Sequence, residues 1–118
     1  MLEQEALTAF AAISQETRLR IIRLLVVAGA EGLSAGTIAD QIDAAPSRIS
    51  FHLHQLEHAG LIKRRRMGRQ IMYSAIFPAL SALVAFLMHD CCRGHCPYCD
   101  QAIALMAKCT GEPSGSSA

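Results

Sequence analysis

The sequence changes its hydrophobic period at Gly60, and this change constrains the fold more than any other feature. Before Gly60, the residues Ile49, Leu53 and Leu56 recur at the spacing of one helical face. Pro46 favours the first turn of that helix, because the N–H that proline lacks would have no partner there. The pattern therefore predicts a helix that begins at Pro46 and ends just before Gly60.

Two extended runs follow this helix, over residues 61–67 and 70–76, and Gly68-Arg69 separates them. Isoleucine and tyrosine favour strands, and a two-residue connection containing glycine favours a tight antiparallel turn. The sequence therefore predicts a β-hairpin directly after the Pro46 helix.

Three more helical patterns precede the Pro46 helix. They are expected over residues 3–12, 18–28 and 35–41. Ser14 and Ser34 are predicted to cap the second and the third, because a serine hydroxyl accepts hydrogen bonds from the free N–H groups of a first turn. Apolar spacing is expected to turn Leu19, Ile22 and Val26 of the second helix toward the core.

A last helix, over residues 79–88, opens with Pro78 and is apolar on nearly every side. Such a helix is typical of a subunit interface, because a small domain buries only part of its surface. The order of helix, turn, helix and hairpin indicates a mainly α (α+β) fold, a winged helix-turn-helix with a two-stranded β-hairpin wing. We expect a homodimer that forms through residues 3–12 and 78–88.

The charge distribution indicates a nucleic-acid partner, although the net charge is only +1. Five of the eleven basic residues fall within seven positions of the hairpin, namely Lys63, Arg64, Arg65, Arg66 and Arg69. A local positive element on a nearly neutral body suits contacts with DNA phosphates. The alternative is a solvated strand edge that prevents aggregation. The helix-turn-helix order immediately before the hairpin favours DNA.

The Pro46 helix is expected to present DNA-reading groups opposite its buried stripe. The positions projected outward are Ser47, Phe51, His54 and Gln55, with Arg48 and Ser50 on the flanks. Phe51 either contacts a thymine methyl or packs on a neighbouring helix. His52 lies at the edge of the stripe and is assigned to the DNA-proximal set, with a hydrogen bond inside the fold as the alternative.

Four cysteines lie within nine residues directly after the last predicted helix, namely Cys91, Cys92, Cys96 and Cys99. In a reducing compartment this density favours metal or redox chemistry over disulfides. Thiolates are soft ligands, and As(III) or Sb(III) prefers three of them, whereas Zn(II) prefers four ligands in a tetrahedron. We expect As(III) or Sb(III) to bind this cluster as the inducer, the ion that releases the protein from DNA, with Zn(II) as an alternative ion. Because adjacent helical side chains diverge, binding through Cys91 and Cys92 should distort the end of the preceding helix.

These features divide the chain into three parts. Residues 1–90 are expected to form a winged-helix DNA-binding and dimerisation domain, residues 91–110 a cysteine-rich inducer-binding segment, and residues 111–118 a disordered tail. No apolar run reaches the roughly 20 residues of a membrane helix, and the acidic start lacks the features of a secretory signal. We therefore expect a cytoplasmic protein without a membrane partner.

The stretch ISFHLHQLEHAGLI, residues 49–62, resembles a signature of the ArsR/SmtB family of metal- and metalloid-responsive repressors. In that family the string V/I-S-x-H-L-x-x-L-x-x-A-G-L-V/I spans the recognition helix and the start of the wing. The stretch ISQETRLRIIRLL, residues 13–25, is similar to the family's second helix. With residues 77–88, the resemblance covers most of residues 1–90. It implies a dimer whose recognition helices enter successive major grooves of double-stranded operator DNA, at an imperfect inverted repeat, until ligand releases it.

The resemblance also bears on the cysteines. Some arsenic sensors of this family use a vicinal cysteine pair after the last dimer helix and one further cysteine, which implies Cys91 and Cys92 with either Cys96 or Cys99. Two other family sites are missing, because residues 37–40 hold no cysteine pair and residues 80–83 hold no zinc-sensing ligands.

Other ligands and another class of protein stay open. A repressor of this kind could sense Cd, Pb or Zn ions, or thiol oxidants and persulfides. Residues 96–99, Cys-Pro-Tyr-Cys, equal a glutaredoxin active-site tetrapeptide, so a thiol oxidoreductase or metal carrier is the second hypothesis. A structural four-cysteine zinc site is a further alternative. The redox motif needs a preceding strand, whereas a helix is expected here, so we expect no enzymatic activity.

Overall fold

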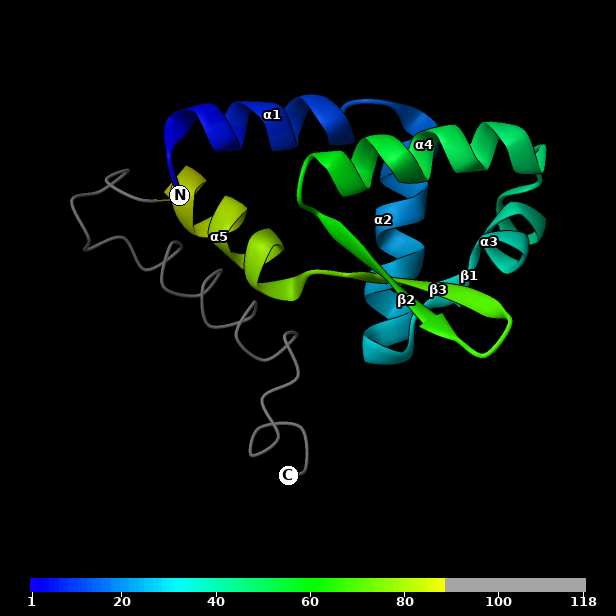
Figure 1. Cartoon of the computed structure of the whole chain (residues 1–118). Helices are drawn as coiled ribbons and strands as arrows, with labels where there is room; N and C mark the ends of the chain where they lie inside the picture. Colours follow the sequence, from blue (N-terminus) through cyan, green and yellow to red (C-terminus); the bar gives the residue numbers. More distant parts are fainter. Residues whose placement is uncertain (89–118) are drawn as a thin grey trace. The chain divides into compact units, whose positions relative to one another are not determined.

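The structure is a computed structural model that describes residues 1–88 of the chain. Its elements, in chain order, are α1 (Glu3–Ile13), α2 (Glu16–Ala28), the 3₁₀ helix η1 (Gly29–Glu31), β1 (Leu33–Ser34), α3 (Ala35–Ile42), α4 (Pro46–His58), β2 (Ile62–Met67), β3 (Gln70–Ala75) and α5 (Phe77–Met88) (Figure 1). Residues 2–76 form one compact unit, and Met1 and α5 belong to a second. The predicted cysteine-rich segment 91–110 and the tail 111–118 lie outside the described residues.

The mainly α fold and the winged helix-turn-helix order are confirmed. The predicted Pro46 helix, α4, packs against α1, α2, α3 and β2. Figure 1 shows α4 crossing α2, with the β2–β3 hairpin extending beyond the helices. This hairpin is the predicted wing.

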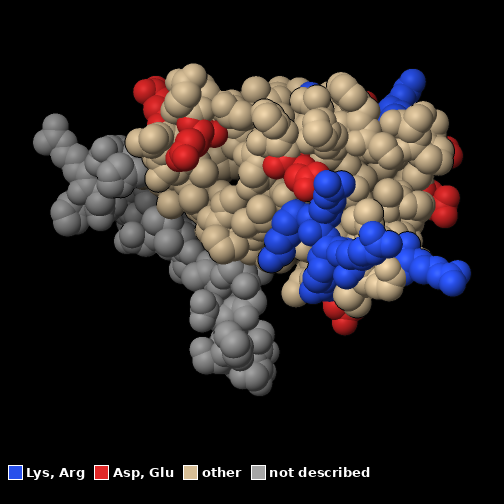
Figure 2. All heavy atoms as spheres, viewed as in Figure 1, with Lys and Arg blue, Asp and Glu red and all other residues tan. Residues whose placement is uncertain are grey.

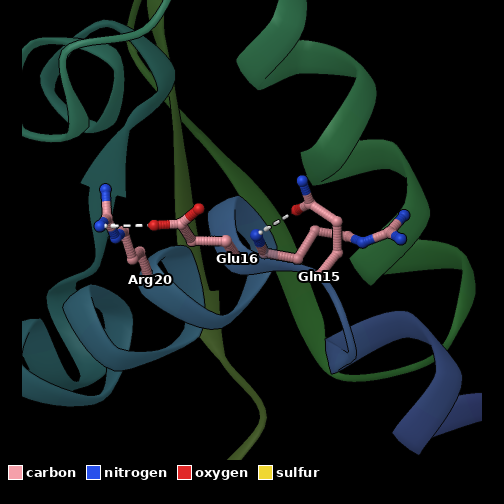
Figure 3. A network of polar contacts seen from close by, with 4 residues as sticks. Gln15, Glu16 and Arg20 are labelled. Carbon is pink, nitrogen blue, oxygen red and sulfur yellow. Dashed lines mark hydrogen bonds and ion pairs between the residues drawn. The ribbon is translucent and has the colours of Figure 1, made fainter.

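The start of α2 differs from the prediction. Ser14 still donates its backbone N–H to the Phe10 carbonyl at 3.0 Å, so it ends α1 and does not cap α2. The cap is Gln15, whose extended backbone lets its side-chain oxygen accept from the Arg18 N–H at 2.9 Å (Figure 3). Serine is a stronger capping residue than glutamine, so the sequence favoured Ser14 as the cap. Because Ser14 ends α1, the cap of α2 falls one position later, on Gln15.

The other helix ends follow local chemistry. Ser34 caps α3 as predicted, because its hydroxyl accepts from the Thr37 N–H at 3.2 Å. α4 begins with Pro46 in its first turn and ends at His58. Gly60 then adopts a φ of +80°, which turns the chain from α4 into β2.

The sheet has three antiparallel strands in the order β1-β3-β2, where the sequence predicted two. In the wing, Met67 pairs with Gln70 across the two-residue turn, as predicted. The additional strand β1 pairs Leu33 with Tyr73. Gly32 permits this approach, since its φ is +73° and any side chain on it would overlap the Tyr73 carbonyl oxygen. Two residues are too few to show an alternating pattern, so the sequence indicated only a turn there.

The core of the 2–76 unit lies between the helices and the base of the wing. Its largest fully buried side chains are Ile21, Leu25, Ile38, Ile49, Leu53, Leu56, Leu61 and Ile62. The prediction for α2 was partly wrong, because Leu19 is 46% exposed and Val26 is 37% exposed, whereas Ile22 is buried. α2 is apolar on more than one face, and periodicity does not say which face meets the core.

α5 begins two residues before the predicted helix and contains no charged residue. No helix within residues 1–88 has the length and apolar content needed to cross a membrane.

Candidate nucleic-acid interface

The outer face of α4 carries the side chains that the sequence placed there. Ser47, Arg48, Ser50, Phe51 and His54 are all exposed. The opposite stripe of Ile49, Leu53 and Leu56 is at most 1% exposed, so it fixes the rotation of the helix. The five outer side chains therefore share one accessible surface.

Phe51 is 57% exposed, so it does not pack into the core. Its ring meets the His52 ring edge-on at a centroid distance of 5.5 Å. An exposed aromatic ring on a polar helix face is suited to apolar contact with a thymine methyl. His54 stacks on His58 one turn later, at 6.5 Å between centroids.

His52 differs from the other positions predicted on α4, because it is only 8% exposed and belongs to the interior. It lies close enough to Arg18 of α2 for that charge to act on it, so it is on the flank of α4 that faces α2. The alternative of an internal hydrogen bond is not met at Nδ1, which is buried and has no partner among the described residues. Burial lowers the pKa of His52, and the positive charges of Arg18 and Arg48 lower this pKa further. His52 is therefore a neutral imidazole at neutral pH.

Gln55 is half-buried and does not point straight away from the core. It lines a cavity of about 320 Å³ between α1 and α4, together with Thr8, Arg18 and His58. Its side chain therefore lies at the border between the outer face of α4 and the adjoining helices.

The wing carries the basic cluster. All five of its basic residues are exposed: Lys63, Arg64, Arg65, Arg66 and Arg69. Figure 2 shows basic side chains gathered over the hairpin. Because side chains alternate along a strand, Lys63 and Arg65 lie on one face of β2, and Arg64 and Arg66 lie on the other. The wing thus presents positive charge on both faces.

One acidic residue that the sequence reasoning missed connects the wing to α4. Glu57 Oε2 lies 3.3 Å from Arg64 Nε. At the tip, Arg66 Nε donates to the Gly68 carbonyl at 3.4 Å. The Glu57–Arg64 pair ties the inner end of the wing to the helix. Glu57 belongs to the half-buried flank of α4, but the sequence contained no signal for its partner in another element.

Arg18 was also missed. It lies in the first turn of α2 and lines the cavity beside Gln55, and its Nε is buried without a partner among residues 1–88. By contrast, Arg20 pairs with Glu16 at 2.7 Å on the exposed side of α2 (Figure 3).

The predicted thiolate ligands Cys91, Cys92, Cys96 and Cys99 lie outside the described residues. Within residues 1–88, no three His, Cys, Asp or Glu side chains group closely enough to hold a metal ion.

The chain is similar to known DNA-binding regulators. A family model for a helix-turn-helix domain matches residues 13–65. The HTH-type transcriptional regulator YgaV of Escherichia coli (strain K12) is 32% identical over 89 residues, which is 75% of this chain and 88% of that protein. A candidate arsenical resistance operon repressor ArsR of Halobacterium salinarum is 39% identical over 74 residues, which is 63% of this chain. The chain spans only 57% of the length of the Halobacterium protein.

Among solved structures, an ArsR-like transcriptional regulator from Rhodococcus sp. RHA1 superposes with a TM-score of 0.64. It is 32% identical in sequence, and the match covers 71% of this chain and 76% of that one. The match with YgaV covers most of that protein. The matching region of this chain includes the helices, the wing and the exposed face of α4. The chain belongs to the ArsR family of winged-helix regulators.

Proposed function

We propose that the chain is a metalloid-responsive transcriptional repressor that binds operator DNA as a homodimer. One observation carries the DNA-binding part of this proposal. The exposed polar face of α4 adjoins a wing with five exposed basic residues, and the Glu57–Arg64 pair joins the two elements. A reading helix beside a positive hairpin is the arrangement that winged helices use on duplex DNA.

Each part of the face suits one kind of contact. The short hydroxyls of Ser47 and Ser50, near the start of α4, suit base edges or nearby phosphates in the major groove. Phe51 suits a thymine methyl, and Arg48 suits a guanine edge or a phosphate. The arginines of the wing then contact the phosphate backbone of the DNA, and these contacts give affinity without sequence preference.

A homodimer would present two such faces. α5 has no charged residue, and Leu2 before α1 and Leu7 on α1 are 70% and 56% exposed. Apolar surface of this kind is stabilised by a second copy. With two-fold symmetry, the matching operator is an imperfect inverted repeat.

The inducer part of the proposal rests on the sequence after residue 88. Three of the four thiolates Cys91, Cys92, Cys96 and Cys99 would hold As(III) or Sb(III), with Zn(II) as an alternative ion. The likeness to a candidate arsenical resistance repressor supports this choice of ligand. Binding just after α5 would change the dimer packing that spaces the two α4 helices. A preference of about 1.4 kcal/mol for the released state weakens DNA binding about tenfold.

Fluorescence anisotropy on a duplex from the chain's own upstream region tests the DNA-binding part. We expect a saturable complex at low salt that arsenite dissociates. Arg65→Gln, on the face of β2 away from the Glu57 pair, should weaken this complex and reduce its salt dependence by about one ion. Absence of any complex formed by the wild-type chain would exclude the repressor.

Single Cys→Ser variants at positions 91, 92, 96 and 99 test the inducer part. Loss of the arsenite response in the variants at 91 and 92, and at one of 96 and 99, is expected. The fifth cysteine, Cys109, lies ten residues beyond Cys99 and outside the cluster, so Cys109→Ser serves as the control. X-ray absorption of the arsenite-loaded protein should show sulfur neighbours around arsenic. A spectrum without sulfur neighbours would contradict the proposed ligands.

A further inference from the structure

The flank of α4 that faces α2 has buried polar groups that nothing in residues 1–88 satisfies. Arg18 Nε and His52 Nδ1 are both buried, and neither has a hydrogen-bond partner in this part of the chain. A buried polar atom without a partner lowers stability, and it does so more where the group is charged. Such groups therefore call for an explanation in terms of a missing partner.

The electrostatics of this flank are positive. Arg18 and Arg48 both lie close enough to His52 for their charges to act on its protonation. The described ion pairs, Arg20–Glu16 and Arg64–Glu57, involve neither of them. Of these two guanidinium groups, Arg48 is exposed, whereas Arg18 is half-buried and has no described carboxylate to balance it.

A cavity of about 320 Å³ adjoins this flank, between the C-terminal half of α1 and the C-terminal half of α4. Arg18 lines it, and so do Thr8, Gln55 and His58. A guanidinium, a carboxamide and an imidazole can donate hydrogen bonds, whereas the Thr8 hydroxyl already donates to the Gln4 carbonyl at 3.1 Å. The lining contains no acidic residue. Donors without acids around a cavity are the features of an anion site.

We propose that the cavity between α1, α2 and α4 binds a tetrahedral oxyanion of the phosphate type, with Arg18 as its charged ligand and Gln55 and His58 as further donors. Arginine is the side chain best suited to this task, because its planar fork can donate two parallel hydrogen bonds to two oxygens of one anion.

Two sources could supply the phosphate group. His58 is exposed at the end of the outer face of α4, so a backbone phosphate of bound DNA can reach the mouth of the cavity. This source rests on the proposed function. The other source is a free anion that binds without DNA and stabilises the base of the reading helix.

The test compares the wild-type chain with Arg18→Gln and Arg18→Lys. Arg20→Gln is the matched control, because Arg20 lies on the same helix but pairs with Glu16 at the surface. In one arm, inorganic phosphate is titrated at constant ionic strength against a chloride control, and the melting temperature and calorimetric heat are recorded. In the other, the DNA affinity is measured from low to high salt.

If DNA supplies the group, Arg18→Gln should lower the slope of log affinity against log salt by about 1, and Arg20→Gln should leave it unchanged. If a free anion supplies it, Arg18→Gln should weaken phosphate binding about tenfold or more while the slope stays the same. Arg18→Lys keeps the charge, so it should restore the salt slope, but it lacks the planar fork and should restore only part of the phosphate binding. An unchanged slope together with unchanged or absent phosphate binding would overturn the proposal.

Circular dichroism checks that the variants fold. If Arg18→Gln does not, Gln55→Ala carries the phosphate arm of the test, because the shorter alanine side chain removes a donor from the cavity without touching α2. Weaker phosphate binding is then expected, and unchanged binding would overturn the proposal. Should the wild-type chain bind no DNA, the proposed repressor fails, while the phosphate titration still decides whether the cavity binds an anion.

Discussion

The two flanks of α4 differ in how their charges are balanced. On the wing side, Glu57 and Arg64 form an ion pair, with 3.3 Å between Glu57 Oε2 and Arg64 Nε, and this pair joins α4 to β2. On the α2 side, Arg18 and Arg48 surround the buried His52, and neither forms an ion pair within residues 1–88. Both sides use arginine, but only the first is neutralised inside the protein.

This difference separates a structural task from a binding task. A partly exposed ion pair adds little stability, but it can fix the direction of a hairpin that is otherwise solvated on both faces. The unbalanced, half-buried guanidinium of Arg18 beside a cavity costs stability unless an anion joins it. We therefore assign the orientation of the wing to the first flank and the binding of an anion to the second.

The largest expected effect on stability comes from removing a core side chain that holds both flanks of α4 in place. Leu56→Ala deletes a fully buried side chain of α4 and should lower the free energy of unfolding by about 2–5 kcal/mol, since it leaves a cavity in the core. Urea denaturation followed by circular dichroism measures the loss. Phe51→Ala, at an exposed position of the same helix, should change stability by only about 0.5 kcal/mol. Equal losses in both variants would mean that the buried stripe does not hold α4.

Loosening the α2 flank alone should have a smaller effect. Gln15→Ala removes the side chain that caps α2 through the Arg18 N–H, so we expect a loss of about 1 kcal/mol in the free energy of unfolding. Ser14→Ala is the control, because the Ser14 hydroxyl makes no such contact in residues 1–88. Thermal melts of both variants show whether Gln15 or Ser14 caps α2. A larger loss of stability in Ser14→Ala than in Gln15→Ala would favour Ser14, the cap that the sequence predicted.

Breaking the balance on the wing flank should act on DNA more than on stability. Glu57→Gln frees Arg64 and removes a negative charge near the proposed DNA surface, so affinity should rise by up to about fivefold, equivalent to about 1 kcal/mol. Anisotropy titration at low salt measures this change. Weaker binding would show that the pair matters chiefly because it directs the wing.

The smallest effect concerns His52, at the centre of the α2 flank. Because its pKa is lowered in the folded protein, the unfolded chain binds this proton at higher pH than the folded one does. Stability is therefore full above the ordinary value of 6.5 and decreases as pH falls from there toward the folded pKa. His52→Asn should flatten the dependence of unfolding free energy on pH, which denaturant titrations at several pH values measure. A steep dependence that survives in His52→Asn would assign the effect to another group.

Sequence reasoning predicted most elements of the fold, because their signals are local. The spacing of Ile49, Leu53 and Leu56, with Pro46 before them, was enough to place α4 and its outer face. The turn at residues 68–69 was enough to place the wing and its register. The exposure of Ser47, Arg48, Ser50 and His54 followed from these two facts.

The errors and omissions occurred where several elements meet. The inward face of α2, the strand β1 and the burial of His52 each depend on which surface packs on which. The Glu57–Arg64 pair and the cavity at Arg18 bring together residues from different elements. The periodicity of the sequence does not predict which residues of different elements come into contact.

The sequence by itself determined the order of helices and wing, the outward face of α4 and the basic charge of the hairpin, because each depends on neighbours within a few residues. Only the tertiary structure decided which arginines are balanced and which are not. Charge balance depends on distances between elements, and those distances exist only after the helices have packed.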